Sequence, residues 1–300
     1  MKQDWYHPRK LAALCRLAQI NHAITPQFTE KQLADQSGKV FIVTGSTSGI
    51  GRALAGILYQ RNAKVYIAAR SETKAQATID EIKQEHPDST GELVYLHLDL
   101  NDLTTIKTSA DEFLSKESRL DVLWNNAGVM VPPQGSKSAQ GYELQIGTNN
   151  LAPFLSTELL HPIMKQTAQT AAKNSVRVIW VSSSAAQYAS RPAIDLSNKR
   201  EEGIWPKYIR SKAGNVLHSA EFARRTKGEG IISLRFVSKD PIFGAYTEIF
   251  AGLYPGIEEG HNGGWVVPFG RHAPVPPALV DPELSQKYWE WTEEQVRPYR

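Results

Sequence analysis

The chain contains 300 residues, of which 41% are hydrophobic and 22% charged, a balance typical of a globular protein with a sizeable buried core. The formal net charge is only +3, from 34 Lys and Arg against 31 Asp and Glu, which argues against nucleic acid or an anionic membrane as a partner. The single cysteine, Cys15, excludes an intramolecular disulfide and metal sites of the Cys-x-x-Cys type.

The N-terminal stretch Leu11–Ile20 is moderately apolar, but Arg16 and Gln19 interrupt it. It is shorter than the roughly 18 apolar residues that a membrane-spanning helix needs, and no small-residue cleavage site follows it. We expect a short amphipathic helix docked on the main domain, with a peripheral membrane contact as the alternative. The expected location is the cytoplasm.

Predicted strands and helices then alternate along the chain. The strands are near-continuous apolar runs, and the helices carry apolar residues at helical spacing. Strands are expected at 38–44, 63–69, 93–98, 120–124, 177–181 and 231–236, and helices at 50–61, 71–85, 102–116, 141–173 and 206–227. This alternation predicts an α/β fold of the Rossmann type, a doubly wound parallel sheet in a three-layer α/β/α single domain.

The C-terminal part of the chain has a different composition, because eight of the 17 prolines and three of the seven tryptophans follow residue 240. Proline disfavours both helix and ladder pairing, so 268–282 is expected to be an irregular surface run before a short helix near 283–295. The predicted organisation is a helical extension (1–37), the sheet domain (38–250) and a Pro/Trp-rich tail packed on that domain (251–300).

A glycine-rich turn, Thr44-Gly-Ser-Thr-Ser-Gly-Ile-Gly51, joins the first predicted strand to the first predicted helix. Glycines let the backbone turn sharply and approach a pyrophosphate, whose charge is met by the helix N-terminus. Because the turn follows a strand and opens a helix within a βαβ unit, it predicts a dinucleotide site. The contacting residues expected here are Gly45, Ser48, Gly49, Ile50 and Gly51.

The second predicted strand ends at Arg70, where a site for NAD would carry an acidic residue. Arg70 can instead pair with the 2′-phosphate of NADP. Arg52 and Lys74 could add positive charge, and Asp99, just after the third strand, could meet the adenine. The sequence therefore predicts NADP(H) as the cofactor.

Two motifs together resemble the short-chain dehydrogenase/reductase family, in its classical branch. They are the glycine turn and Asn125-Asn-Ala-Gly128 after the fourth strand, and the match covers roughly residues 38–236. The resemblance implies that Asn126 lines the cofactor site. The run Val65–Arg70 and the long interval before the candidate catalytic tyrosine look like the retinol dehydrogenase and WW-domain oxidoreductase-like subgroup, including its fungal members.

Tyr208 and Lys212 are four residues apart in a predicted helix and therefore share one face of it. A free phenol has a pKa near ~10 and is a poor acid or base at neutral pH, so a nearby ammonium is expected to lower that pKa. Such tuning prepares a tyrosine for general acid–base catalysis. A Tyr-x-x-x-Lys alone is often a solvated helix face, but the other motifs favour the catalytic interpretation.

Ser183, after the fifth predicted strand, could hydrogen-bond a substrate carbonyl or alkoxide oxygen. It is the second of three successive serines, and the family pattern implies that position rather than its neighbours. The same resemblance assigns Asn149 to a water-mediated proton relay toward Lys212, with Asn150 as the competing choice.

These residues imply hydride transfer between a nicotinamide and a carbonyl carbon, with Tyr208 exchanging the proton, Ser183 holding the oxygen and Lys212 also holding the nicotinamide ribose. No metal is expected. Candidate substrate-facing residues are apolar or aromatic, which favours a hydrophobic ketone or alcohol such as a lipid, polyketide or terpenoid of secondary metabolism: Tyr188, Trp205, Phe243 and Tyr246. NADP favours reduction, and the family resemblance leaves a homo-oligomer open.

The pattern departs from the family after Phe236. The family usually has a Pro-Gly turn there, then a threonine that contacts the nicotinamide carboxamide and a substrate-covering helix, but here no Pro-Gly follows the strand. We therefore expect a shortened covering element. The alternative hypothesis is a redox-impaired protein that acts as a non-redox enzyme or a nucleotide-binding regulatory module, although the intact Ser183, Tyr208 and Lys212 favour an oxidoreductase.

Overall fold

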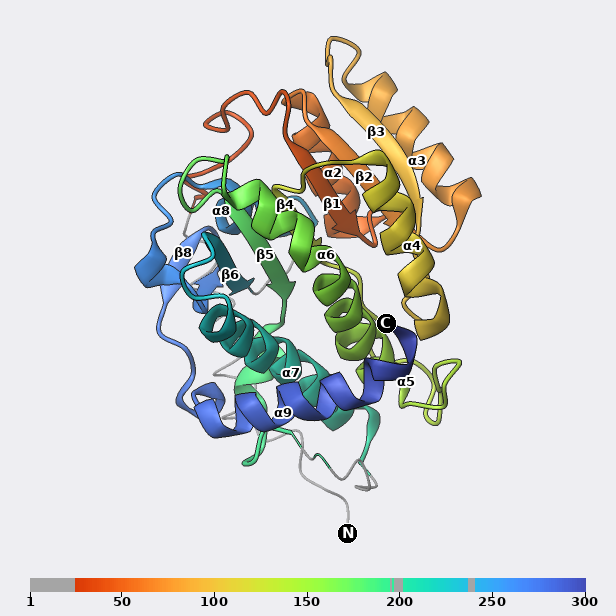
Figure 1. Ribbon diagram of the computed structural model, residues 1–300, viewed down its shortest axis with the longest axis vertical. Coiled ribbons are helices and arrows are strands. Elements are labelled where there is room, and N and C mark those ends of the chain that lie inside the picture. The colour runs from red at the N-terminus through yellow and green to blue at the C-terminus, as the bar shows by residue number, and fades with distance from the viewer. Residues whose placement is uncertain (1–24, 195, 197–201, 237–240) are drawn as a thin grey trace.

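The computed structural model describes residues 25–194, 196, 202–236 and 241–300 (Figure 1). The N-terminal helix predicted within residues 11–20 lies outside the described residues. The boundaries 1–37, 38–250 and 251–300 stay a prediction.

One sheet organises the described chain, with strand order β3-β2-β1-β4-β5-β6-β7-β8. Its strands are β1 (Val40–Thr44), β2 (Lys64–Ala69), β3 (Glu92–His97), β4 (Val122–Asn125), β5 (Val176–Val181), β6 (Ile231–Phe236), β7 (Gly264–Val267) and β8 (Arg271–Ala273). Strands β1 to β7 are parallel, and β8 is antiparallel to β7. The order reverses between β1 and β4, and ligands of such sheets bind at the carboxyl ends of the strands beside this reversal.

Helices cover both faces of the sheet, because its central strands are apolar on both sides and would otherwise expose them. One face carries α2 (Gly49–Gln60), α3 (Glu72–Glu85) and α8 (Pro241–Leu253), and the other carries α4 (Leu103–Lys116), α5 (Leu144–Ile146), α6 (Ala152–Ala168) and α7 (Ile204–Arg225). Figure 1 shows α9 (Pro282–Val296) lying across α7, with which it packs. The predicted three-layer α/β/α fold is confirmed.

The prediction of one helix over 141–173 was wrong. The segment contains α5, then a π-helical turn at Gly147–Leu151, and then α6, which ends at Ala168. Gly147 lies against Ser138, where an added Cβ would be only 3.0 Å from the serine Cβ. A π-turn inserts one extra residue into a helix and re-aims the side chains around it, and such turns are frequent at functional sites.

The prediction of an irregular run over 268–282 was also wrong in part. Within this segment, Arg271–Ala273 forms β8, which pairs with β7. Of the five prolines in this region, the two nearest β8, Pro268 and Pro274, flank Arg271–Ala273 rather than interrupting it, so the ladder loses no donor. Proline is tolerated at such positions next to an edge strand. The final helix is α9, close to its predicted bounds.

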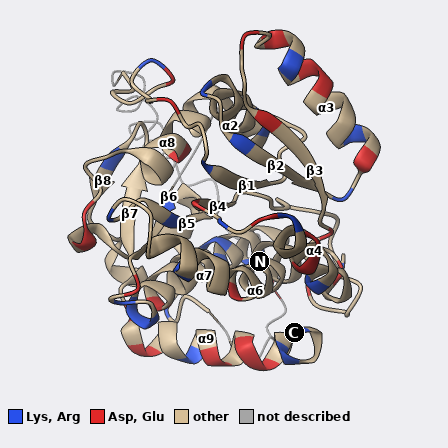
Figure 2. Cartoon of the chain, turned by 45° about the horizontal axis from the view of Figure 1, so that its top comes forward, with Lys and Arg blue, Asp and Glu red and all other residues tan. Residues whose placement is uncertain are grey.

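Charged residues of both signs lie along α3, and α9 carries mostly acidic residues, as Figure 2 shows. Within the described ranges, no helix is long and apolar enough to cross a membrane.

Candidate active site

The turn between β1 and α2 lies against the segment that follows β4. Gly45 has φ +69°, and a Cβ there would stand 2.9 Å from the Cα of Ala127, so only glycine allows this approach. Asn126 Nδ2 donates to the Thr44 carbonyl over 2.8 Å, and the Ala127 N–H donates to Thr44 Oγ1 over 2.9 Å. The two predicted motifs therefore form one rigid unit at the carboxyl edge of the sheet.

The N-terminus of α2 is open to an anion. Its N-cap, Ser48, makes no side-chain capping hydrogen bond, and the first turn carries no acidic residue. Gly49 has φ +58° and has no atom within 4 Å of an added Cβ. The free backbone N–H groups and the helix dipole suit a pyrophosphate here. Gly51 also has a packing role, because an added Cβ would stand 2.6 Å from Asn126 Nδ2.

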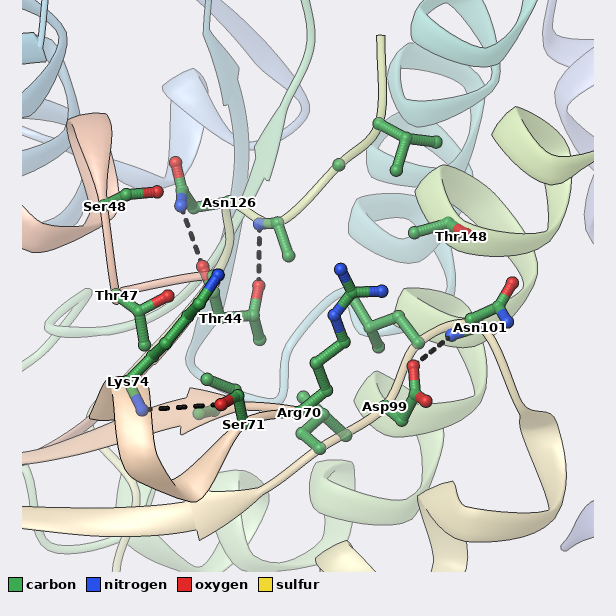
Figure 3. A pocket seen from close by; sticks show the side chains of 18 of the residues that line it. Thr44, Thr47, Ser48, Arg70, Ser71, Lys74, Asp99, Asn101, Asn126 and Thr148 are labelled. Atoms are coloured by element: carbon green, nitrogen blue, oxygen red, sulfur yellow. Dashed lines mark hydrogen bonds between the residues drawn. The ribbon is translucent and has the colours of Figure 1, made fainter. Parts of the chain in front are cut away.

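A cavity of about 800 Å³ extends from this turn across the ends of β1, β2 and β3. The predicted cofactor residues that line it are Gly45, Ser48, Ile50, Arg70, Lys74, Asp99 and Asn126. Figure 3 shows Arg70 and Lys74 pointing into the cavity from its β2 and α3 side, with Asp99 beyond Arg70. Asp99 Oδ1 accepts from the Asn101 N–H over 2.9 Å, which fixes the loop at that end.

Three exposed cations line this cavity, Arg70, Lys74 and Lys137, and the two that were predicted differ from Arg52. Neither Arg70 nor Lys74 has an ion pair within the part of the chain that the structure describes, so both charges remain available to a ligand. The Arg52 guanidinium instead pairs with Glu81 over 3.0 Å and with Glu85 over 2.6 Å on α3. The expectation that Arg52 adds positive charge to the cofactor site was therefore wrong.

Tyr208 and Ser183 meet at the carboxyl edge of β5. Tyr208 lies in the first turns of α7 and is buried, and its hydroxyl hydrogen-bonds Ser183. Burial raises the pKa of Tyr208, and the hydrogen bond with Ser183 opposes that rise. The direction is opposite to the lowered pKa expected from Lys212, because desolvation outweighs the effect of neighbouring groups.

The neighbouring serine has a structural role. Ser182 Oγ donates to the Lys212 carbonyl over 2.7 Å and is buried. Ser183 Oγ also accepts from the Ala185 N–H over 3.2 Å, which caps the 3-10 helix Ser184–Tyr188. Of these adjacent hydroxyls, the one predicted from the sequence is the one that faces Tyr208.

Lys212 is buried behind Tyr208. Its Nζ donates to the Val181 carbonyl over 3.0 Å and lies 5.9 Å from the centre of the Tyr208 ring. Burial lowers the pKa of Lys212 to about 8, and the charge of Glu248 opposes this decrease. A lysine in this environment can change its charge near neutral pH.

Asn149 sits in the π-helical turn and binds the backbone that follows β4. Its Oδ1 accepts from the Val129 N–H over 2.8 Å, and its Nδ2 donates to the Val129 carbonyl over 2.9 Å and to Ser211 Oγ over 3.0 Å. A Cβ added to Gly128 would stand 3.0 Å from Asn149 Oδ1 and 3.4 Å from Lys212 Nζ. Both side chains therefore converge behind Gly128.

The side chain of Asn150, the competing choice for the proton relay, points toward α7. Its Nδ2 donates to the Ser211 carbonyl over 2.8 Å and to Asn215 Oδ1 over 2.7 Å, both on α7. These bonds tie α7 to the π-helical turn and leave Asn149 as the amide on the side of Lys212.

Comparison with known proteins identifies the family. The family model described as short chain dehydrogenase matches residues 39–194. The chain belongs to the short-chain dehydrogenase/reductase family. A short-chain dehydrogenase/reductase of Emericella nidulans, pkfC, is 49% identical over 91% of this chain and 97% of its own length. The finer resemblance to the retinol dehydrogenase subgroup stays a prediction.

Two solved structures share the fold. An uncharacterized protein from Mycobacterium paratuberculosis superposes with a TM-score of 0.75 at 28% identity, covering 90% of this chain and 97% of that protein. A metagenomic short-chain oxidoreductase in complex with NADP superposes with a TM-score of 0.59 at 25% identity, covering 74% of this chain and 94% of that one.

This short-chain dehydrogenase/reductase lacks residues that its Emericella relative has. Their alignment spans 304 positions although it includes only 91% of the 300 residues of this chain. After β6 ends at Phe236, α8 already begins at Pro241. The shortened covering element expected after Phe236 stays a prediction.

One residue of the site was missed by the sequence analysis. Glu248 is fully buried on α8 and interacts electrostatically with Lys212. It is the only charged residue of Pro241–Leu253, and an acid within an otherwise apolar helix was the signal that could have identified it.

Proposed function

We propose that this protein is an NADP-dependent oxidoreductase that interconverts a ketone or aldehyde with an alcohol on a hydrophobic substrate. The observation that carries the proposal is the Ser183–Tyr208 hydroxyl pair, at the same sheet edge as the cavity with its free cations. A purely nucleotide-binding module has no chemical use for this pair.

The residues present suit a dinucleotide with a 2′-phosphate. The uncapped α2 N-terminus would meet the pyrophosphate, and Asp99 would face the adenine end of the cavity. Arg70 and Lys74 would hold the 2′-phosphate, because a guanidinium binds phosphate bidentately and no acid stands at the end of β2 to bind a ribose hydroxyl. The NADP carried by the metagenomic relative supports this assignment.

A bound nicotinamide cofactor supplies or accepts the hydride. The chain's own residues manage the proton and the oxygen. Because its pKa is raised, Tyr208 keeps its proton at neutral pH and can donate it to the substrate oxygen in the direction of reduction. Ser183 would hold that oxygen by a hydrogen bond while the charge develops on it. Lys212 and Asn149 lie behind Tyr208 and would help to replace its proton.

Exposed apolar side chains beside Tyr208 favour a hydrophobic substrate. Trp205 is 55% exposed, and its ring centre lies 6.2 Å from that of Tyr208. Tyr188 and Met130 follow the serine segment and the Asn125–Gly128 motif and are also exposed. Of the other two predicted substrate-facing residues, Phe243 packs against Phe269, and Tyr246 hydrogen-bonds Glu30.

The test is the Tyr208→Phe variant assayed with NADPH and a panel of hydrophobic ketones and aldehydes. Loss of the acidic hydroxyl is expected to reduce turnover by about 1,000-fold while NADPH binding is kept. Tyr95→Phe, which removes a phenol hydroxyl on β3 that hydrogen-bonds His97, is the matched control and is expected to keep full activity.

Normal turnover by Tyr208→Phe would contradict the acid–base assignment. Turnover of small polar carbonyls alone would contradict the substrate class. NADPH binding by a wild-type protein that reduces no carbonyl would favour the nucleotide-binding module instead.

A further inference from the structure

Gln145 is a buried amide that lies between the segment after β4 and the start of α7. Its Oε1 accepts from the Val131 N–H over 3.1 Å. Its Nε2 donates to the Ile204 carbonyl over 3.3 Å and to Glu143 Oε1 over 3.3 Å. One side chain therefore joins two segments that are far apart in the sequence.

Val131 has a backbone conformation that valine rarely adopts. Its φ is +51°, in the left-handed region, where a side chain branched at Cβ is strained. Pro132 follows it and further narrows the conformations that are open to it. Such a conformation persists only where surrounding contacts hold it, and the hydrogen bond from the Val131 N–H to Gln145 is a contact of this kind.

The two joined segments carry exposed apolar side chains. Met130, next to Val131, is 63% exposed, and Trp205, next to Ile204, lies with its ring centre 6.2 Å from that of Tyr208. We call Met130, Val131, Ile204 and Trp205 the substrate wall. Because Gln145 is fully buried, it acts on a substrate through the wall that it binds.

Asn149 makes a second bridge between the same two parts of the chain. It binds the backbone of Val129 and donates to Ser211 Oγ on α7 over 3.0 Å. This bridge lies beside Lys212, whereas the bridge from Gln145 reaches the first residue of α7. The segment after β4 is thus fixed to α7 both beside the reacting groups and at the substrate wall.

We propose that Gln145 is a positioning residue that fixes Met130 and Trp205 relative to each other and so shapes the wall that receives a hydrophobic carbonyl substrate. This role rests on the proposed function, which places the substrate beside these side chains. A wall that is ordered before binding saves the cost of ordering it when the substrate arrives. The hydroxyl pair of Tyr208 and Ser183 does not need this bridge, because the two residues bond each other directly.

The first test is the steady-state kinetics of Gln145→Met in the full chain. The substrates are NADPH and the member of the hydrophobic panel, such as acetophenone, that the wild type reduces best. Methionine fills the buried space but cannot make the two bridging bonds. We expect KM for the ketone to rise about tenfold and kcat to change less than about threefold, because binding of the substrate is weakened and the reacting groups are kept.

Gln140→Met is the matched control. Gln140 is a bridging glutamine of the same loop, but its Oε1 accepts from the Leu103 N–H over 3.1 Å and its Nε2 donates to Asp102 Oδ1 over 2.7 Å. It therefore binds the start of α4 and not α7, and its loss is expected to leave KM unchanged. An unchanged KM in Gln145→Met, or an equal rise in Gln140→Met, would overturn the proposal.

Hydrogen exchange of the Val131 amide, followed by NMR, gives a test that needs no turnover. We expect the wild-type amide to exchange at least about 100-fold more slowly than in an unstructured peptide, and about tenfold faster in Gln145→Met than in the wild type. Gln140→Met should exchange as the wild type does.

A Val131 amide that exchanges freely in the wild type would overturn the proposal even if Gln145→Met does not fold. An unchanged exchange rate in a folded Gln145→Met would overturn it as well. A wild type that reduces no carbonyl would instead contradict the proposed function, and the exchange of Val131 would still decide whether Gln145 holds the wall.

Discussion

The two halves of the site differ in how the chain builds them. The nucleotide half is open: Arg70, Lys74 and Ser48 are exposed, and the α2 N-terminus offers free backbone donors. The reacting half is closed, because Lys212 on α7 and Asn149 in the π-helical turn are both buried.

This difference determines what sets the chemistry of each half. In the open half, the charges that face the cavity determine which cofactor binds. Water already solvates these charges, and a ligand only replaces that water. In the closed half, burial decides which protonation state is stable, as the pKa shifts of Tyr208 and Lys212 show. A substitution in the first half should change affinity, and one in the second should change folding and proton transfer.

Reversing the charge at Arg70 should have the largest effect in the open half. Arg70→Glu is expected to weaken NADPH binding by about 3 kcal/mol, roughly 100-fold, because a bidentate contact is replaced by repulsion. NADH binding should be kept, since a ribose hydroxyl can pair with the new carboxylate. Arg297→Glu, the same charge change at an exposed C-terminal site, is the control for isothermal titration.

An equal loss of affinity for NADPH and NADH in Arg70→Glu would show that the substitution damages the cavity as a whole. Unchanged NADPH affinity would remove Arg70 from the 2′-phosphate site.

A smaller effect is expected from disturbing the packing of α8 against Trp124. Gly252→Ala forces a Cβ into the Trp124 ring and should lower the free energy of unfolding by about 2 kcal/mol, measured by denaturant titration. Gly260→Ala has open space around its Cβ and should leave stability almost unchanged. Equal stabilities of the two variants would mean that α8 does not press on Trp124.

The open half could be predicted from the sequence because its signals are local. The glycine turn, Arg70 and the motif at Asn125–Gly128 are each read from a few consecutive residues, and all of them line the cavity or support its wall. The six apolar strands of the parallel sheet were predictable for the same reason: a strand buried on both faces reads as a continuous apolar run.

The closed half depends on long-range contacts, which no local pattern records. The π-turn that aims Asn149 at Val129 and the salt bridges that turn Arg52 away both join distant segments. The pairing of β8 was missed because proline content was averaged over the tail, whereas only the positions of the prolines relative to the ladder matter.

The most direct test of the account is a titration of the purified protein with NADPH and with NADH, followed by energy transfer from tryptophan to the reduced nicotinamide. We predict tight binding of NADPH and much weaker binding of NADH, since the exposed Arg70 and Lys74 face the cavity and no acid does so at the end of β2. Equal affinity for the two would contradict the role of Arg70. Binding of neither would contradict the assignment of the cavity to a nicotinamide dinucleotide.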